Sequence, residues 1–247
     1  MTKTPHMSEA LRFYLLTNKL KYIIRTYCLE GYWNIPHERL ESVAEHVYGT
    51  CMIAIALDSE YDLGIDINHV IKMLVCHEIE ELVIGDITPF DDVTDEEKLA
   101  EGQKGIDYIL GNLIKKDEYI ALLDEFEAKE TEEAQFAFFC DKIEVILQAN
   151  IYDDAYHVDL ETAGEKLLND PKIKSIRAAG FNNLGDIFVE FDRLIRHYES
   201  FPPFLNILNE IQITDTTFVL GPRGENRQDR DKANKFVREL KQEFNSD

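Results

Sequence analysis

Apolar residues recur along most of this chain three or four positions apart, which is the spacing of one face of an α-helix. Between residues 183 and 199, for example, Leu184, Ile187, Phe191 and Leu194 fall on a single stripe. We find no internal repeat, and the pattern therefore predicts an all-α fold. Helices are expected over residues 9–29, 42–58, 66–84, 94–114, 117–129, 132–153, 160–168, 171–179 and 183–199.

Capping signals set the ends of several of these helices. Ser42 is followed three residues later by Glu45, which is the spacing of a capping box at a helix start. Asp66 can accept hydrogen bonds from the first free amides of the next helix, and Gly85 can end that helix. Residues 31–36 are rich in turn formers, so a loop is expected after the first helix.

We expect one main domain over residues 8–200 and a C-terminal extension over residues 201–247, because no flexible linker divides the chain. The segment 132–153 is the most apolar helix and is predicted to cross the core. In the extension, a loop with a brief hairpin around 216–220 is expected before a polar helix over 231–244. That last helix packs either on the domain or on a partner subunit.

The net charge of the chain limits the classes of molecule that it is expected to bind. The 247 residues include 48 acidic and 26 basic side chains, for a net charge of -22. Such a field repels nucleic-acid polymers and anionic membranes, so neither is expected as a partner. A small phosphate ester remains compatible, because a metal ion and a well-placed arginine reverse the sign locally.

The four cysteines indicate a reducing environment. Cys28, Cys51, Cys76 and Cys140 lie far apart in apolar contexts and form no C-x-x-C pair, so we expect buried free thiols. No apolar signal segment follows Met1, and no apolar run reaches the ~18 residues that a membrane span needs. The expected location is the cytoplasm.

Candidate chemistry begins with a polar pair inside an apolar stretch. His77 and Glu78 interrupt the segment V-C-H-E-I-E-E-L-V-I, which is predicted to be mid-helix. Helical spacing places Met73, His77 and Glu81 on one stripe, with Glu78 about 100° away around the axis. One imidazole and two carboxylates can then converge on the same small volume.

Two further residues can complete a metal site. His46 lies on a separate predicted helix, and Asp141 interrupts a run of apolar residues, where an isolated carboxylate is costly to bury. Two histidines and two carboxylates suit Mn, Co, Fe, Zn or Mg. Taken singly, each residue has an ordinary structural interpretation, and Asp141 can also pair with Lys142.

Four segments carry a family resemblance over roughly residues 10–155. They read L-K-Y-I-I-R-T at 20–26, R-L-E-S-V-A-E-H at 39–46, H-E-I-E-E-L-V-I-G-D-I-T-P at 77–89 and E-T-E-E-A-Q-F-A-F-F-C-D-K-I-E-V-I-L-Q-A at 130–149. In this order they resemble the HD-domain superfamily, specifically the branch that contains the bacterial 5′-deoxynucleotidases. The resemblance implies a compact helical bundle that binds one divalent metal ion.

The resemblance also implies roles for single residues. His46, His77 and Asp141 match the family's metal ligands, and Glu78 stands where the family has its aspartate. Glu81 and Asp86 match acids near the attacking water, with Glu81 as the candidate base, and Arg25 matches an arginine that orients the substrate phosphate. The expected substrate-binding residues are Arg25, Thr26, Asp86, Ile87, Thr88 and Pro89.

The chain departs from the family pattern at two of these positions. The extra methylene of Glu78 moves its carboxylate by about 1.5 Å, so Glu78 either ligates directly after a small shift, ligates through water, or marks a degenerate site. Thr26 replaces an aromatic residue that contacts the sugar, a role that Trp33 can take over unless it is a structural anchor. Arg39 can contact phosphate or form a salt bridge with Glu41 or Glu45.

The leading functional hypothesis is a metal-dependent enzyme that hydrolyses nucleoside 5′-monophosphates, with deoxy forms preferred. Hydrolysis of guanosine tetraphosphate is a weaker alternative, because that branch carries H-D-x-x-E-D and Leu82 fills the last position here. The non-enzyme alternative is a nucleotide-binding or scaffold protein that lost turnover through Glu78. A homodimer is expected from the family's habit and from the apolar helix over 183–199.

Overall fold

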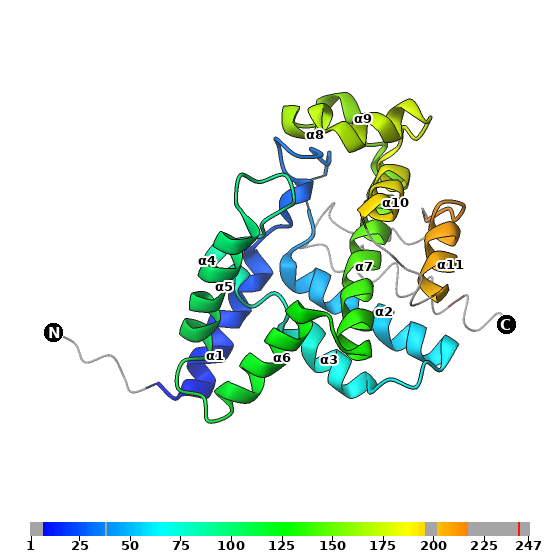
Figure 1. Cartoon of the computed structure of the whole chain (residues 1–247). Coiled ribbons are helices and arrows are strands. Elements are labelled where there is room, and N and C mark those ends of the chain that lie inside the picture. The colour runs from blue at the N-terminus through cyan, green and yellow to red at the C-terminus, as the bar shows by residue number, and fades with distance from the viewer. Residues whose placement is uncertain (1–6, 38, 196–201, 217–241, 243–247) are drawn as a thin grey trace.

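The computed structural model describes residues 7–37, 39–195, 202–216 and 242, and these residues fold as a bundle of helices (Figure 1). Within these ranges the chain forms no strand, only an isolated bridge between Ile24 and Ser42. The longer helices are α1 (Glu9–Thr17), α2 (Val43–Tyr61), α3 (Ile67–Cys76), α5 (Asp95–Leu110), α6 (Lys116–Ala128), α7 (Glu132–Tyr156), α9 (Pro171–Ala178), α10 (Leu184–Ile195) and α11 (Pro202–Ile211). The short ones are α4 (Glu81–Ile84), α8 (Glu165–Asn169) and the 3₁₀ turns η1 (Asn18–Tyr22), η2 (Thr26–Cys28) and η3 (Leu160–Thr162). The all-α prediction is confirmed.

Helix α7 is the centre of the bundle. It packs against α2, α3, α6, α10 and α11, and side chains on all of its sides are buried. Phe136 of α7 and Phe204 of α11 are completely buried, with ring centroids 5.6 Å apart. The prediction that this segment crosses the core is therefore confirmed. Because α7 packs against helices from both halves of the chain, a polar residue on it is fixed relative to all of them.

A second apolar cluster lies at the far end of α7. Tyr27, Trp33 and Ile35, from the segment after the first helices, pack there against residues of α9 and α10. This cluster brings two segments that are far apart in sequence onto the same side of the domain.

The expected single helix over residues 9–29 is wrong, because the helix ends at Thr17 and a 3₁₀ turn follows it. Residues 23–25 are extended and hydrogen-bond to the segment before α2: Arg25 N donates to Glu41 O at 2.9 Å, and Val43 N donates to Ile23 O at 2.8 Å. Branching at Cβ of two successive isoleucines favours an extended backbone. Tertiary pairing thus overrides the helical spacing here.

The expected helix over residues 66–84 is also interrupted. Helix α3 ends at Cys76, residues 77–80 form turns, and α4 begins at Glu81. The imidazole of His77 donates to the carbonyl oxygen of Leu74 at 2.7 Å, which satisfies one of the free carbonyls at the end of α3. His77 and Glu78 therefore lie at a helix end rather than mid-helix.

The predicted capping residues are confirmed. Ser42 and Glu45 form the capping box of α2, and the side chain of Asp66 accepts from the first amides of α3. Gly85 ends α4 with a φ of 78°. Gly111 ends α5 earlier than position 114, where the sequence pattern placed the end.

The extension after residue 200 contributes a helix that the sequence reasoning did not assign. Phe204, Leu208 and Ile211 of α11 are buried against the core, mainly on α7. The expected hairpin beyond residue 216 and most of the expected helix over 231–244 lie outside the described residues.

The thiols agree with the expectation from the sequence. All four are free; Cys28, Cys76 and Cys140 are buried and Cys51 is partly buried. Among the described helices, none combines the length and the hydropathy that crossing a membrane requires.

Candidate metal centre

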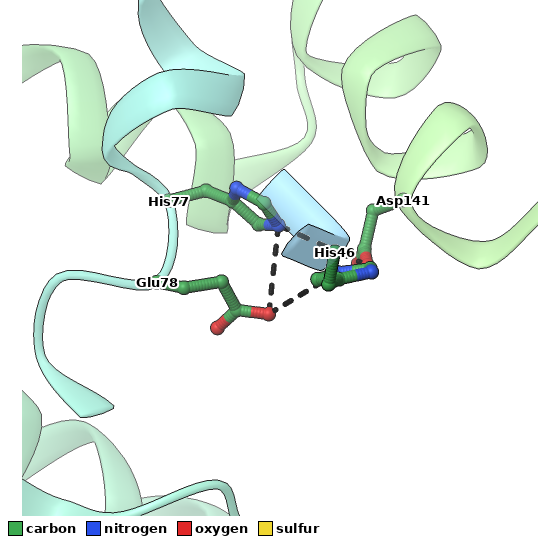
Figure 2. A group of neighbouring side chains, drawn as sticks. All are labelled: His46, His77, Glu78 and Asp141. Atoms are coloured by element: carbon green, nitrogen blue, oxygen red, sulfur yellow. Dashed lines mark hydrogen bonds and ion pairs between the residues drawn. The ribbon is translucent and has the colours of Figure 1, made fainter. Parts of the chain in front are cut away.

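Four side chains that are far apart in the sequence meet between α2, α3 and α7 (Figure 2). His46 comes from α2, Asp141 from α7, and His77 and Glu78 from the residues directly after α3. Each of the four side chains offers one possible ligand atom, a nitrogen or an oxygen, and these four atoms all lie within 4.8 Å of one another. His46 Nε2 is 3.0 Å from Asp141 Oδ1 and 3.6 Å from Glu78 Oε1. His77 Nε2 is 3.5 Å from the same Glu78 oxygen.

The hydrogen bonds of the two imidazoles decide which nitrogen faces this cluster. His77 Nδ1 lies 2.7 Å from the carbonyl oxygen of Leu74, which can only accept, so Nδ1 carries a proton. His46 Nδ1 lies 2.5 Å from the carboxylate oxygen Oε2 of Glu144 and donates in the same way. Each histidine therefore turns Nε2 toward the two carboxylates, as a metal-binding imidazole does.

The Nε2 atom of His77 indicates that a metal ion fits between the four side chains. His77 Nε2 is buried and has no hydrogen-bond partner among the described residues. A buried polar atom without a partner costs free energy, and a cation between the four side chains would remove that cost. Two imidazole nitrogens and two carboxylate oxygens form a donor set that first-row divalent metals accept. The residues present therefore fit a divalent cation.

The charges of the cluster also favour a cation. Burial alone would raise the pKa of Asp141, but Lys142 and the histidines outweigh it and hold that pKa well below its ordinary value. Burial is likewise outweighed at Glu78, where His77 and Arg25 lower the pKa to about 2. Both carboxylates are therefore ionised at neutral pH. The ion pair that the sequence allowed between Asp141 and Lys142 also forms, at 2.5 Å.

Arg25 lies beside the cluster among three carboxylates. Its Nη1 atom is 3.1 Å from Asp86 Oδ1, 3.3 Å from Glu78 Oε1 and 3.8 Å from Glu81 Oε1. Burial opposes the charge of the guanidinium, but these carboxylates outweigh it and raise the pKa of Arg25 further. Its Nε atom is buried without a hydrogen-bond partner in the described part of the chain. The carboxylates beside Arg25 therefore engage its Nη1 atom and leave its Nε donor without a partner.

Glu81, the first residue of α4, is only 3% exposed. Burial and repulsion by Glu78 and Asp86 raise the pKa of its carboxyl group to about 12. Its Oε2 atom has no hydrogen-bond partner among the residues that the structure describes. In the protein without a metal ion, the carboxyl group of Glu81 is therefore protonated at neutral pH. Positive charge added among the four side chains of the cluster would lower the pKa of Glu81.

Asp86 ties the exit of α4 to the segment that carries Arg25. Its Oδ2 accepts from the backbone N–H of Thr26 at 2.5 Å, and the Thr26 hydroxyl donates to the Asp86 carbonyl oxygen at 2.6 Å. Both oxygens of the Asp86 carboxylate are thus engaged, one by Thr26 and one by Arg25. Asp86 holds the arginine in place, and Thr26 does not line the cavity described next.

A cavity of about 300 Å³ opens beside the cluster, a size that suits a small ligand. The polar part of its wall includes six residues that the sequence singled out, namely Arg25, His77, Glu78, Glu81, Asp86 and Asp141, and also the acids Glu80, Glu127 and Asp192. The loop after α4 also contributes, through Ile87, Thr88 and Pro89. Three cationic residues that the sequence reasoning did not assign to a binding site are Lys98, Lys129 and Lys142.

The sequence reasoning did not assign Glu41 and Glu144, two buried acids that lie next to His46, to the site. Glu41, His46 and Glu144 bring ligand atoms within 4.8 Å of one another. Burial and the charge of Glu144 raise the pKa of Glu41 well above its ordinary value. Glu144 follows Asp141 by three residues on α7, so helical spacing places both on one face and could have revealed it.

The structure also decides two open interpretations. Trp33 is 3% exposed, packs with its ring centroid 5.8 Å from that of Phe188 and lines the cavity, so it is both an anchor and part of the wall. Arg39 forms its salt bridge with Glu45 and is not part of the cavity wall.

A helical bundle that brings two histidines and two carboxylates to one point defines a class of metal-binding domain. A family model described as an HD domain matches residues 17–177 of this chain, well over half of its length. The chain belongs to the HD-domain family, as its resemblance predicted.

Two relatives with similar sequences are both named 5′-deoxynucleotidase HDDC2. It is 35% identical over 158 residues to 5′-deoxynucleotidase HDDC2 of Dictyostelium discoideum, an alignment that covers 61% of this chain and 81% of the relative. It is 31% identical over 150 residues to 5′-deoxynucleotidase HDDC2 of Homo sapiens, with 60% of this chain and 70% of the relative covered.

Solved structures support the same fold. A conserved hypothetical protein from Pyrococcus furiosus aligns with a TM-score of 0.56 at 24% identity and covers 82% of this chain and 98% of its own. A protein from Magnetospirillum magnetotacticum MS-1, described as a predicted metal-dependent phosphohydrolase, aligns with a TM-score of 0.54 at 22% identity. That alignment covers 83% of this chain and 92% of the other.

Proposed function

We propose that this protein is a divalent-metal-dependent phosphohydrolase that converts deoxynucleoside 5′-monophosphates to deoxynucleosides and inorganic phosphate. The observation that carries the proposal is the buried set of two imidazoles and two ionised carboxylates, placed at a cavity that also contains a charged arginine. The names of the relatives supply the substrate class.

His46, His77, Glu78 and Asp141 would hold the cation, which we expect to be Mn, Co, Fe, Zn or Mg. When bound, a divalent cation offsets charge on phosphoryl oxygens and lowers the pKa of water in its vicinity. The contact of Glu78 Oε1 with both histidine Nε2 atoms, at 3.5 and 3.6 Å, supports direct ligation by the longer carboxylate. It argues against the alternative of a scaffold protein whose site has decayed at this position.

Arg25 is the proposed contact for the substrate phosphate. Its Nη1 atom is occupied by carboxylates, but Arg25 lines the cavity, and the rigid guanidinium fork can offer further N–H donors in the same plane. Asp86 acts as a positioning residue, since it fixes the backbone of Thr26 and one edge of Arg25. Thr88 and its neighbours in the loop would bound the nucleotide.

Glu81 is the proposed general base. Glu81 belongs to the cavity wall, and its Oε2 atom has no hydrogen-bond partner among the described residues, so its carboxylate would accept a proton from the water that attacks phosphorus. Repulsion by Glu78 and Asp86 contributes to the raised pKa of Glu81, so neutralisation of Glu78 by a bound cation would bring this pKa down toward the working range.

Phosphate release by the metal-stripped full-length protein tests the proposal. A panel of deoxynucleoside and ribonucleoside 5′-monophosphates is incubated with Mn, Co, Mg or Zn, and Asp141→Asn serves as the inactive control. We expect metal-stimulated release from the deoxy substrates and none from the variant. Absence of release with every metal would overturn the proposal, and recovery of release by Glu78→Asp alone would favour the decayed scaffold.

We also propose a cytoplasmic homodimer, which light scattering of the purified protein and its localisation would test. The apolar face of α10 does not itself support the dimer, because it packs within the chain against α7 and α9.

A further inference from the structure

One face of α10 lines part of the cavity. Phe188, Phe191, Asp192 and Ile195 all belong to the cavity wall, and their spacing of three, four and seven positions places them on the same side of the helix. The helix begins at residue 184, after the segment 17–177 that the HD-domain model matches. This part of the wall is therefore supplied from outside the matched segment.

Aromatic rings from two loops meet this face of α10. Trp33 and Phe188 have ring centroids 5.8 Å apart, and Phe90 and Phe191 have theirs 5.7 Å apart. All four residues line the cavity. The result is an apolar, largely aromatic surface in the same cavity as the proposed metal site, and a planar heterocycle gains from stacking on such rings.

One short segment connects Arg25 to this aromatic surface. Arg25 contacts the proposed ligand Glu78, and only two residues later Tyr27 packs on Phe188, with centroids 5.6 Å apart. Two residues of chain reach at most about 7 Å. The backbone of Arg25 and that of Tyr27 thus lie close together in one cavity wall, so a ligand whose phosphate lies at Arg25 can extend toward the aromatic surface.

We infer that the face of α10 formed by Phe188 and Phe191, together with Phe90 and Trp33, binds the nucleobase of the substrate. The inference rests on the proposed function and adds that the base is recognised mainly by stacking. Stacking accepts every base, so this surface selects for the presence of a base more than for its identity. Phosphate esters that lack a base would bind only through the metal and Arg25.

Replacement of one ring tests this inference with two measurements. For Phe191→Ala, we expect kcat/KM for deoxynucleoside 5′-monophosphates to fall about tenfold, mainly through KM, while the rate with 2-deoxyribose 5-phosphate stays unchanged. Calorimetry with the product deoxynucleoside, which needs no turnover, is expected to show a similar loss of affinity. Leu194→Ala is the matched control, since Leu194 is 59% exposed on the same helix and is not part of the cavity wall.

Phe90→Ala, which removes a ring from the opposite loop, provides a second variant if Phe191→Ala fails to fold, and the same losses are expected. The inference is overturned if the wild type binds deoxynucleoside no more tightly than 2-deoxyribose. Equal losses with 2-deoxyribose 5-phosphate and with nucleotides would overturn it too. Failure of the proposed function has a different signature, namely no phosphate release from any substrate, whatever the outcome of the binding measurement.

Discussion

The Nδ1 atom of His46 lies 2.5 Å from the Oε2 atom of Glu144, and both side chains are buried. This contact places a carboxylate behind a proposed metal-binding imidazole and fixes both the tautomer and the orientation of the ring. Gly49, on the same helix as His46, leaves the space that Glu144 occupies. A Cβ atom at position 49 would lie 2.4 Å from Glu144 Oε1.

Removal of this carboxylate should weaken metal binding. We expect Glu144→Ala to raise the dissociation constant for the metal by about 10- to 100-fold, with a smaller effect for Glu144→Gln, which keeps an acceptor. Gly49→Ala is expected to act in the same direction because it displaces Glu144. Isothermal titration calorimetry measures the constants, and circular dichroism checks the fold. Unchanged affinity in a folded Glu144→Ala protein would contradict the role of Glu144.

Metal removal should lower the thermal stability of the protein. A ligand that binds only the folded state stabilises it by about 2.7 kcal/mol at 100 times its dissociation constant. We therefore expect the melting temperature to fall on treatment with a chelator and to recover when Mn or Zn is restored. Asp141→Asn, which loses a carboxylate of the cluster, should show neither change. A chelator response of equal size in that variant would mean that the metal binds elsewhere.

Arg25→Lys should lose activity although it keeps the charge. An ammonium group cannot reproduce the planar fork that holds Asp86 and a phosphate at once. A charged hydrogen bond contributes about 1.5–3 kcal/mol, so kcat/KM is expected to fall by roughly 10- to 150-fold. Steady-state kinetics check this, with Lys98→Arg as a control for a general charge effect. Full activity of Arg25→Lys would show that Arg25 acts only as a positive charge.

The capping box of α2 predicts a pH-dependent stability. Burial opposes the charge of Glu45, but hydrogen bonds from Ser42 and the charge of Arg39 hold its pKa below the ordinary value. A depressed carboxyl pKa stabilises the fold above the unfolded pKa of about 4.3, and this contribution is lost as the pH falls through the folded value. We expect Glu45→Gln to cost about 1 kcal/mol at pH 7, with a smaller cost in acid.

Denaturant unfolding at several pH values measures that cost. Glu97→Gln is the matched control, because Glu97 completes the same kind of box with Thr94 at the start of α5. Both variants should show the same dependence on pH, but only Glu45→Gln is expected to reduce metal affinity, since α2 carries His46. A pH-independent cost at Glu45 would rule out the charged cap.

A substitution at Gly85 should affect stability only through the strain of its backbone conformation. Its φ of 78° and ψ of 170° belong to a region that only glycine readily adopts, and a Cβ there would meet nothing within 4 Å. Gly85→Ala should therefore destabilise the protein by about 1–3 kcal/mol. Gly102→Ala, inside α5, should have the opposite sign because alanine favours helix. Chemical denaturation distinguishes the two, and equal effects would contradict the assignment.

Local signals accounted for much of the fold. Asp66 and the pair of Ser42 and Glu45 start their helices as their spacing predicted, because caps depend on neighbours in sequence. The same local reasoning singled out His46, His77, Glu78 and Asp141, which the structure brings within reach of one another. The sequence contains many other acids, and the pattern of one helix does not show which residues of another helix lie beside it. The family resemblance was therefore needed to choose these four residues as a set.

Long-range contacts explain what the sequence did not reveal. The spacing of apolar residues continues through residues 18–25, but hydrogen bonds to residues 41–43 hold part of this segment extended. Trp33 is the only tryptophan in the sequence, and nothing near it in the sequence indicates that α10 packs against it to form the aromatic part of the cavity wall. Glu144 was visible in principle, although its contact with His46 joins positions 98 residues apart.

The end of α3 at Cys76 affects which substitutions the proposed metal site can tolerate. The backbone leaves α3 after Cys76, so His77 and Glu78 lie in the turn of residues 77–80 that precedes α4 and not on a regular helix. A turn can adjust to the length of a side chain more readily than the long helices α2 and α7 can. We expect exchange between aspartate and glutamate to be tolerated at position 78 and not at position 141. Divergence of metal preference among related chains would then accumulate in the four residues 77–80.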